Sequence, residues 1–172
     1  ADGPHVRTLL ADAFQLASDV SVTWDGRRDD GLVAADGAYV IVLSVENGCA
    51  SLAEARADVE LDRPPPEVGI VSPAPGQRVR ATVDVSGHVT DERLAHWRLE
   101  VACGAGGPAL VATNRNRIEP EGVIAPWDTS RSPAGSCTLR LAAEDRAQNR
   151  AEVSLPVEVE SGGFVRQLVA TP

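Results

Sequence analysis

The sequence predicts an all-β protein built of two tandem antiparallel β-sandwiches, and three observations lead to that fold class. Apolar and polar residues alternate with a period of two along most of the 172 residues, as in strands that bury one face. Clusters of Gly, Pro, Asn and Asp separate these runs at short intervals, as turns separate the strands of a sandwich. Three consecutive prolines divide the chain into two parts, each close to the size of a small domain.

The clearest alternation lies between Ala53 and Leu61. Its apolar members are Ala53, Ala55, Ala57, Val59 and Leu61, and charged residues stand between them. Ala, Glu and Arg favour helices, but a helix would distribute these charges around its whole circumference, so the segment is predicted to be a strand. The same alternation recurs at Val79–Val85, Trp97–Cys103, Cys137–Ala143 and Val153–Val159. One turn of helix is predicted, at Ala11–Ala17.

A domain boundary is predicted at Asp62-Arg63-Pro64-Pro65-Pro66, because proline cannot donate to a β-ladder and favours a stiff, extended connection. The predicted organisation is a first sandwich at 1–62, a proline-rich linker at 63–67 and a second sandwich at 68–160. The remaining residues, 161–172, are predicted to be a tail or the start of a further module. The chain begins at Ala1 without methionine, which we interpret as a segment of a longer or processed polypeptide.

Composition excludes several classes of partner. The net charge of −9 argues against nucleic acids and anionic membranes, which require a basic surface. No apolar run approaches the roughly 20 residues needed to span a bilayer, so no membrane span is expected. All 16 basic residues are arginine, which suggests a high-GC bacterial genome. Aromatic residues make up only 3%, so Val, Leu, Ile and Ala must build the cores.

A set of residues in the first half carries a family resemblance: His5-Val6-Arg7-Thr8-Leu9, Val22-Thr23-Trp24-Asp25-Gly26-Arg27, Gly31, Gly37, Tyr39 and Val59-Glu60-Leu61-Asp62. With them, residues 5–62 resemble the immunoglobulin-like (Ig-like) domain of the flagellar hook-capping protein, a module widespread in bacterial secreted proteins. In that family a strand normally precedes the segment equivalent to His5–Leu10, and hardly any chain precedes it here. The resemblance therefore implies that the first sandwich lacks its first strand.

The second half, residues 68–160, resembles a bacterial cell-surface Ig-like repeat. The matching segments are Val71-Ser72-Pro73-Ala74-Pro75-Gly76, Ala125-Pro126-Trp127-Asp128-Thr129-Ser130, Gly135-Ser136-Cys137-Thr138-Leu139-Arg140-Leu141 and Glu144-Asp145-Arg146-Ala147-Gln148-Asn149. Cys137 departs from the repeat, which more often carries an aromatic residue there. Such modules act as spacers, adhesion units or docking surfaces, so the two resemblances imply a class of role and no specific ligand.

The tail repeats a pattern from the start of the chain. Residues 163–169, Gly-Phe-Val-Arg-Gln-Leu-Val, are similar to residues 4–10, Pro-His-Val-Arg-Thr-Leu-Leu. Chance is one explanation. The others are that the tail begins another module of the same kind, or that its strand pairs with an open edge in this chain or in a neighbour.

Two of the three cysteines are predicted to form a disulfide. Cys103 ends a run whose core face includes Trp97 and Leu99, and Cys137 begins a run whose core face includes Leu139. If the two runs are antiparallel neighbours, the end of one lies beside the start of the other, as a cross-strand bridge requires. The alternative is two independent buried thiols. Cys49 follows Asn47-Gly48 in a predicted hairpin turn and is expected to be free or to pair with another chain.

We expect no cofactor, with calcium as the alternative. Asp25, Asp29, Asp30 and Asp36 lie in one loop region, but Arg27 stands where a calcium loop would place an oxygen ligand. A polar turn is therefore the favoured interpretation. A second candidate site draws on residues expected near the linker or at strand ends: Asp62, Asp91, Glu92, Asp145 and Asn149.

No catalytic constellation is evident, and the chain is predicted not to be an enzyme. His5, His88 and His96 lack the spacing of metal ligands, and Gly104-Ala105-Gly106-Gly107 follows a predicted strand without opening a helix. Trp24 and Trp127 are candidates for a sugar-stacking platform. Each precedes Asp in a turn where a packing role is more usual, and Trp97 is assigned to the core.

The sequence thus predicts a non-catalytic structural or interaction module of a secreted or surface-displayed bacterial protein. Its expected partner is another protein, or a neighbouring module of the same polypeptide, that pairs through an open strand edge by strand addition. The alternative is an accessory carbohydrate-binding module of a secreted hydrolase, with a glycan as its ligand.

Overall fold

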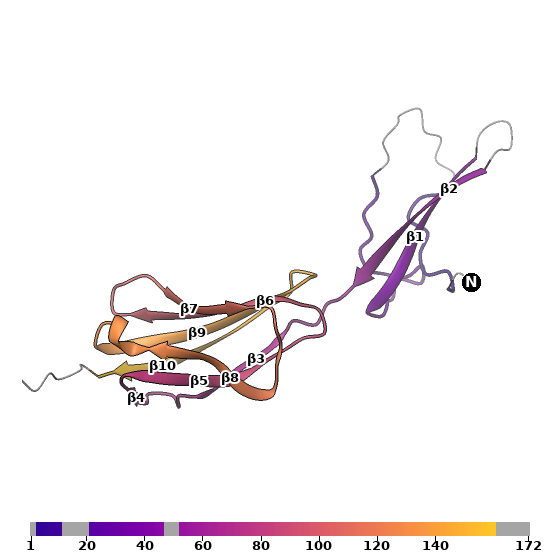
Figure 1. Ribbon diagram of the computed structural model, residues 1–172. Helices are drawn as coiled ribbons and strands as arrows, with labels where there is room; N and C mark the ends of the chain where they lie inside the picture. Colours follow the sequence, from indigo (N-terminus) through magenta and orange to yellow (C-terminus); the bar gives the residue numbers. More distant parts are fainter. Residues whose placement is uncertain (1–2, 12–20, 47–51, 161–172) are drawn as a thin grey trace, which may run out of the picture. The chain divides into compact units, whose positions relative to one another are not determined.

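The computed structural model describes residues 3–11, 21–46 and 52–160, and in these residues the chain is all-β, as predicted. Strands β1 to β10 are accompanied by a single turn of 3-10 helix, η1 (Thr129–Arg131), and no α-helix occurs in the described residues. The chain divides into two compact units, Ala1–Arg63 and Pro64–Pro172 (Figure 1). No helix in the described part of the chain is long and apolar enough to cross a membrane.

Unit 1, residues 1–63, contains one antiparallel ladder in its described part. β1 (Gly37–Glu46) and β2 (Leu52–Leu61) pair from Gly37 opposite Leu61 to Glu46 opposite Leu52. The strand predicted between Ala53 and Leu61 is therefore confirmed. Residues 3–11 and 21–36 carry only the isolated bridge between Arg27 and Val33.

Polar contacts close one end of unit 1. The Arg63 guanidinium donates hydrogen bonds to the Asp36 carboxylate at 2.7 Å, to the Ala34 carbonyl at 2.9 Å and to the Gly26 carbonyl at 3.2 Å. Ala34, at 2% exposed, is the single fully buried hydrophobic residue in the described part of this unit. Unit 1 therefore relies on hydrogen bonds more than on a hydrophobic core in these residues.

Unit 2, residues 64–172, consists of two sheets in its described part. One sheet has the strand order β4-β10-β9-β6-β7 and the other has the order β3-β5-β8 (Figure 1). The strands are β3 (Glu67–Ser72), β4 (Arg78–Val79), β5 (Thr82–Thr90), β6 (Leu94–Cys103), β7 (Ala109–Asn114), β8 (Ile118–Asp128), β9 (Gly135–Asp145) and β10 (Arg150–Val159). All neighbouring strands are antiparallel except β4 and β10, which form a short parallel pair.

The core of unit 2 lies between its two sheets. The face of each strand that alternation predicted to be buried points inward, as the burial of Leu99 on β6 and of Leu139 and Leu141 on β9 shows. Val85 and Val89 on β5 meet them from the other sheet, and all five of these side chains are 0% exposed. One continuous hydrophobic cluster therefore joins the sheets.

The alternating run Val79–Val85 is divided between the two sheets instead of forming one strand. β4 ends at Val79 and pairs with β10, whereas β5 begins at Thr82 and pairs with β3 and β8. Between them, Ala81 has a φ of 58°, outside the range of strand residues. The Ala81 carbonyl accepts hydrogen bonds from the N–H and the hydroxyl of Thr129, at 2.9 and 2.8 Å, which stabilise this crossing between sheets.

Candidate functional site

One face of the β1–β2 ladder is entirely apolar. Residues directly opposite in an antiparallel ladder share a face, and the register pairs Tyr39 with Val59, Ile41 with Ala57, Leu43 with Ala55 and Val45 with Ala53. We call these eight side chains the apolar face. Leu43 is 47% exposed and Val45 is 53% exposed, and the three alanines are exposed as well. Within the described residues, nothing covers this half of the face.

The two outer edges of the ladder are also unpaired in the described residues. β1 and β2 form a two-stranded sheet, so each strand has a partner on one side only. An unpaired edge presents a row of backbone N–H and C=O groups to any further strand. An isolated two-stranded ladder is at best marginally stable in water, so the stability of this ladder depends on contacts beyond its own two strands.

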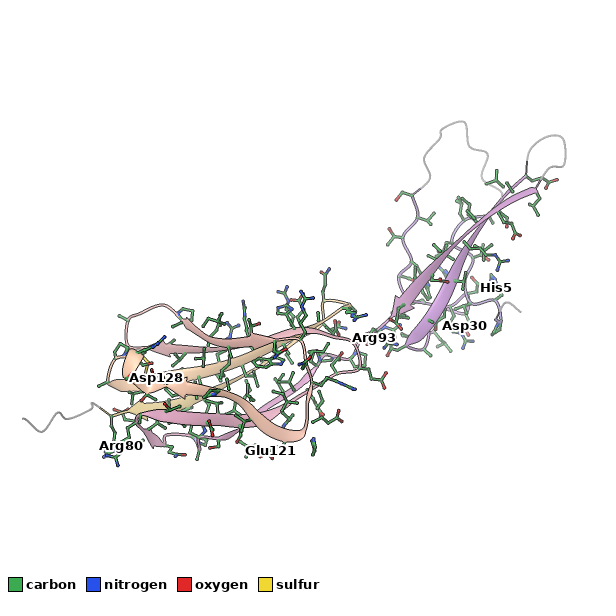
Figure 2. The ribbon with its side chains drawn as sticks, viewed as in Figure 1. His5, Asp30, Arg80, Arg93, Glu121 and Asp128 are labelled. Atoms are coloured by element: carbon green, nitrogen blue, oxygen red, sulfur yellow. A yellow bond between two sulfur atoms is a disulfide. The ribbon has the colours of Figure 1, made fainter. Side chains whose placement is uncertain are left out.

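Residues 5–8 lie against the loop at 25–33. The Asp29 N–H donates to the Val6 carbonyl at 3.0 Å, and the Asp29 carboxylate accepts the Thr8 N–H at 3.0 Å and lies 2.8 Å from His5 Nε2. The hydrogen bonds from the Thr8 N–H and from His5 hold the pKa of Asp29 below its usual value. Figure 2 labels His5 and Asp30 in this region.

The loop aspartates take part in local hydrogen bonds. Asp25 accepts the Arg27 N–H at 3.0 Å, and Asp30 accepts the Leu32 N–H at 3.0 Å and the Arg28 guanidinium at 2.6 Å. These are the contacts of a polar turn, the interpretation favoured over a calcium loop. No group of three or more His, Cys, Asp or Glu residues in the described ranges is placed to hold a metal ion.

The second set of calcium candidates is distributed over both units. Asp62 follows β2 in unit 1, whereas Asp91, Glu92, Asp145 and Asn149 belong to unit 2. Asp145 is 1% exposed and accepts hydrogen bonds from the backbone N–H and the side-chain amide of Asn149, at 2.9 and 2.8 Å. Asp91 accepts the Arg93 N–H at 2.6 Å. Asp91 and Asp145 therefore both stabilise turns.

The predicted disulfide between Cys103 and Cys137 is present. The two residues stand directly opposite each other on β6 and β9, with an S–S distance of 2.05 Å and a Cα–Cα distance of 4.1 Å. Cys137 is 1% exposed and Cys103 is 8% exposed, so the bridge is part of the core of unit 2.

The three tryptophans pack against protein. Trp97 and Trp127 are each 3% exposed, and their indole N–H groups donate to the Asn116 carbonyl at 2.9 Å and to the Ser132 hydroxyl at 3.3 Å, respectively. Trp24, in unit 1, meets Tyr39 edge-on with ring centroids 4.9 Å apart and donates to the Arg27 carbonyl. Trp127, one of the two sugar-stacking candidates, is thus buried in unit 2.

Two adjoining hollows lie at the end of unit 2 where β6 begins. Asp91 and Glu92, two of the calcium candidates, line one of them, and no sequence prediction pointed to the other. The basic hollow, of about 400 Å³, is lined by Leu94, Ala95, His96, Arg115 and Arg146. The acidic hollow, of about 520 Å³, shares Leu94 and Arg115 and is also lined by Asp91, Glu92, Asn116, Arg117 and Glu119. For the basic hollow, the sequence signal was the run Asn114-Arg115-Asn116-Arg117. Arg146 lies far along the chain and is brought to this run by folding.

Several sequence predictions fall outside the described residues. They concern Cys49, the similarity between the tail segment 163–169 and residues 4–10, and most of the helical turn at 11–17. The remaining histidine, His88, lies on β5 opposite Gly69 of β3.

Comparisons with known proteins do not identify a family. No family model matches the chain, and no curated protein matches it. Among solved structures, the chain is similar to the endo-beta-1,4-mannanase from Thermotoga petrophila, with 19% identity and a TM-score of 0.43. The match covers 59% of this chain and 21% of the mannanase chain, so the chain corresponds to about a fifth of that enzyme. A likeness of this size indicates neither a shared family nor a shared activity.

Proposed function

We propose that the chain is a non-catalytic structural and interaction module of a secreted or surface-displayed bacterial protein. It consists of two tandem Ig-like β-sandwiches, and a strand from a neighbouring module of the same kind completes the first. One observation carries this proposal: half of the apolar face of the β1–β2 ladder is exposed in the described residues, on a ladder with two unpaired edges.

The strand order of unit 2 supports the Ig-like part of the proposal. An Ig sandwich places strands A, B and E in one sheet and strands C, F and G in the other. β3, β5 and β8 correspond to the first set, and β6, β9 and β10 correspond to the second, with β7 added beside β6. The buried Trp97 on β6 stands on the strand that carries the buried tryptophan of Ig domains. The Cys103–Cys137 bridge lies within one sheet, unlike the inter-sheet bridge of antibody domains.

The disulfide supports an extracytoplasmic location. Disulfides persist in oxidising compartments and are rare in the reducing cytosol of mesophiles. Cys103 and Cys137 oppose each other directly in the β6–β9 register, so this bridge belongs to the native pairing of the strands.

Strand addition explains how the ladder binds. The added strand would pair with the free edge of β1 or β2, so that unpaired backbone groups gain hydrogen bonds. Its alternate apolar side chains would extend the apolar face and bury Leu43 and Val45. A neighbouring module is the preferred donor because the sequence at 163–169 resembles that at 4–10, as expected where similar modules follow one another.

Adjacent residues of β1 provide a matched test. Leu43 and Val42 are 47% and 45% exposed and point to opposite faces, with Leu43 opposite Ala55 and Val42 opposite Arg56. We expect the chain to self-associate in sedimentation velocity as its concentration rises. Leu43→Lys should abolish this association by placing a charge on the apolar face, whereas Val42→Lys should retain it.

Amide hydrogen exchange locates the contact. Exchange at residues 37–46 and 52–61 should slow as the protein associates, since the edge amides gain partners. A chain that remains monomeric at every concentration, or that associates equally well as Leu43→Lys and as Val42→Lys, would contradict the proposed role of the apolar face.

A further inference from the structure

The two arginines of the basic hollow have no ion-pair partner within the described part of the chain. Several other arginines of unit 2 do: Arg140 bonds Glu152, and Arg150 donates to Glu144 at 2.7 Å. The guanidiniums of Arg115 and Arg146 make no hydrogen bond or ion pair with a described residue, although the chain carries a net charge of −9. The positive charges of Arg115 and Arg146 repel each other in the hollow, and an anion bound between them would attract both.

The hollow is built on adjacent strand ends. β9, β6 and β7 are neighbours in the five-stranded sheet, and they bring together Arg146 after β9, His96 near the start of β6 and Arg115 after β7. The Arg146 N–H donates to the Arg93 carbonyl at 3.0 Å, and the Arg115 N–H donates to the Asn114 side chain at 2.7 Å. Figure 2 labels Arg93 at this end of unit 2 and Arg80 at the opposite end.

The core anchors the loop that carries Arg115. The indole N–H of the buried Trp97 donates to the Asn116 carbonyl at 2.9 Å. The backbone of this arginine is therefore positioned before any ligand arrives, which lowers the entropy cost of binding. The imidazole of His96 adds a hydrogen-bonding group, and Glu144, opposite it on β9, is occupied by Arg150.

The acidic hollow offers a different chemistry directly beside the basic one. Asp91, Glu92 and Glu119 supply carboxylate acceptors, with Glu119 also 3.9 Å from the guanidinium of Arg117, and Asn116 supplies an amide with both donor and acceptor groups. Such groups bind hydroxyls or cations. The two hollows together therefore suit a ligand that carries a carboxylate and several hydroxyls.

We propose that the two hollows form a binding site for a carboxylated sugar unit, such as a uronic acid. Its carboxylate lies between Arg115 and Arg146, whose planar guanidiniums match carboxylate geometry. Its ring hydroxyls donate to the carboxylates of the acidic hollow. Both hollows fall within the usual volume of small-ligand sites, about 300–1,000 Å³. The site is distinct from the apolar face, and the inference does not depend on strand addition.

NMR titration of the chain tests the site with four probes: D-galacturonic acid, its methyl ester, D-galactose and acetate. Galacturonate should produce saturable shift changes at the amides of residues 94–96, 115–117 and 146. The ester and galactose lack the charge and should produce none. Acetate lacks the hydroxyls and should bind more weakly. A galacturonate oligomer distinguishes two sources of the ligand. If the site binds a polysaccharide, the oligomer should bind more tightly than the monomer; if it binds a free sugar acid, the two should bind alike.

Matched arginine variants complete the experiment. Arg115→Gln combined with Arg146→Gln should weaken galacturonate binding about tenfold or more, because both charge-assisted hydrogen bonds to the carboxylate are lost. Arg80→Gln, an exposed arginine at the other end of unit 2, should leave it unchanged. Leu43→Lys should also leave it unchanged, so failure of strand addition and failure of this site are distinguishable. The absence of saturable binding by galacturonate, acetate binding as tightly as galacturonate, or full binding by the double variant would overturn the proposal.

Discussion

Removal of the Cys103–Cys137 disulfide is expected to lower the free energy of unfolding of unit 2 by about 4 kcal/mol. The bridge closes a loop between residues 34 apart in sequence. In the chain-entropy model, a loop of this length restricts the unfolded chain by about 4 kcal/mol near room temperature. Small domains have total unfolding free energies of about 5–15 kcal/mol, so the reduced unit should still fold with a much smaller margin.

The comparison requires three proteins, because alanine also removes buried sulfur. Cys137 is 1% exposed, so Cys103→Ala combined with Cys137→Ala loses core contacts in addition to the bridge. Wild-type protein with the bond reduced retains both sulfur atoms and isolates the effect of the cross-link. We expect the order of stability to be oxidised protein, reduced protein and then the double alanine variant.

Urea unfolding followed by tryptophan fluorescence measures this order. Trp97 and Trp127 are buried in unit 2, and a Trp24→Phe background removes the reporter in unit 1. With a urea dependence of about 1–3 kcal/mol per molar, the midpoint of the reduced protein should fall by roughly 1–4 M. Equal midpoints for the oxidised and reduced proteins would refute the reasoning. Mass measured without reduction checks that the oxidised sample carries the bond.

Two further predictions concern the core of unit 2 and the loop of unit 1. Leu139→Ala, at a side chain 0% exposed, should destabilise unit 2 by about 2–5 kcal/mol in the same urea assay, whereas Leu110→Ala, at 61% exposed, should change stability by less than about 0.5 kcal/mol. Because Asp29 has a lowered pKa in the folded chain, its hydrogen bonds with Thr8 and His5 should be fully present above its ordinary pKa of 3.8 and should weaken as the pH falls through the lower folded value. The NMR shift of the Thr8 amide should report this transition, and Asp29→Asn should remove it; a transition that persists in the variant would assign it to another group.

Local pattern predicted strands in both units and the buried faces of the strands of unit 2, whereas the apolar side of the run Ala53–Leu61 is largely exposed. Period-two alternation places side chains on opposite faces of a strand wherever that strand pairs, so the inward positions of Leu99 and Leu139 could be read without knowing the partner strand. The disulfide followed from the same parity argument, because it required only that the runs ending at Cys103 and starting at Cys137 be antiparallel neighbours. Burial of Trp97 followed in the same way.

Alternation did not reveal where a run changes sheets. Val79 and Val83 belong to the same alternating run, yet β4 and β5 pair in different sheets, and Ala81 between them adopts a positive φ. Hydrogen bonds from Thr129 hold Ala81 in place. The two residues are distant in sequence, so no local sequence pattern predicts this contact. Two tandem Ig-like sandwiches remain our proposal. In the described part of unit 1, the structure contains a two-stranded ladder.

The sequence by itself determined that the chain is all-β and which residues of the alternating runs of unit 2 face inward, and it predicted which two cysteines meet. These properties depend on the geometry of a single strand and on its period of two. Only the tertiary structure decided the order of strands in each sheet, the exposure of Leu43 and Val45 on the apolar face, and the meeting of Arg115 with Arg146 beside β6. These properties depend on which distant segments pack together, and the free energy of that packing does not appear as a periodic pattern in the sequence.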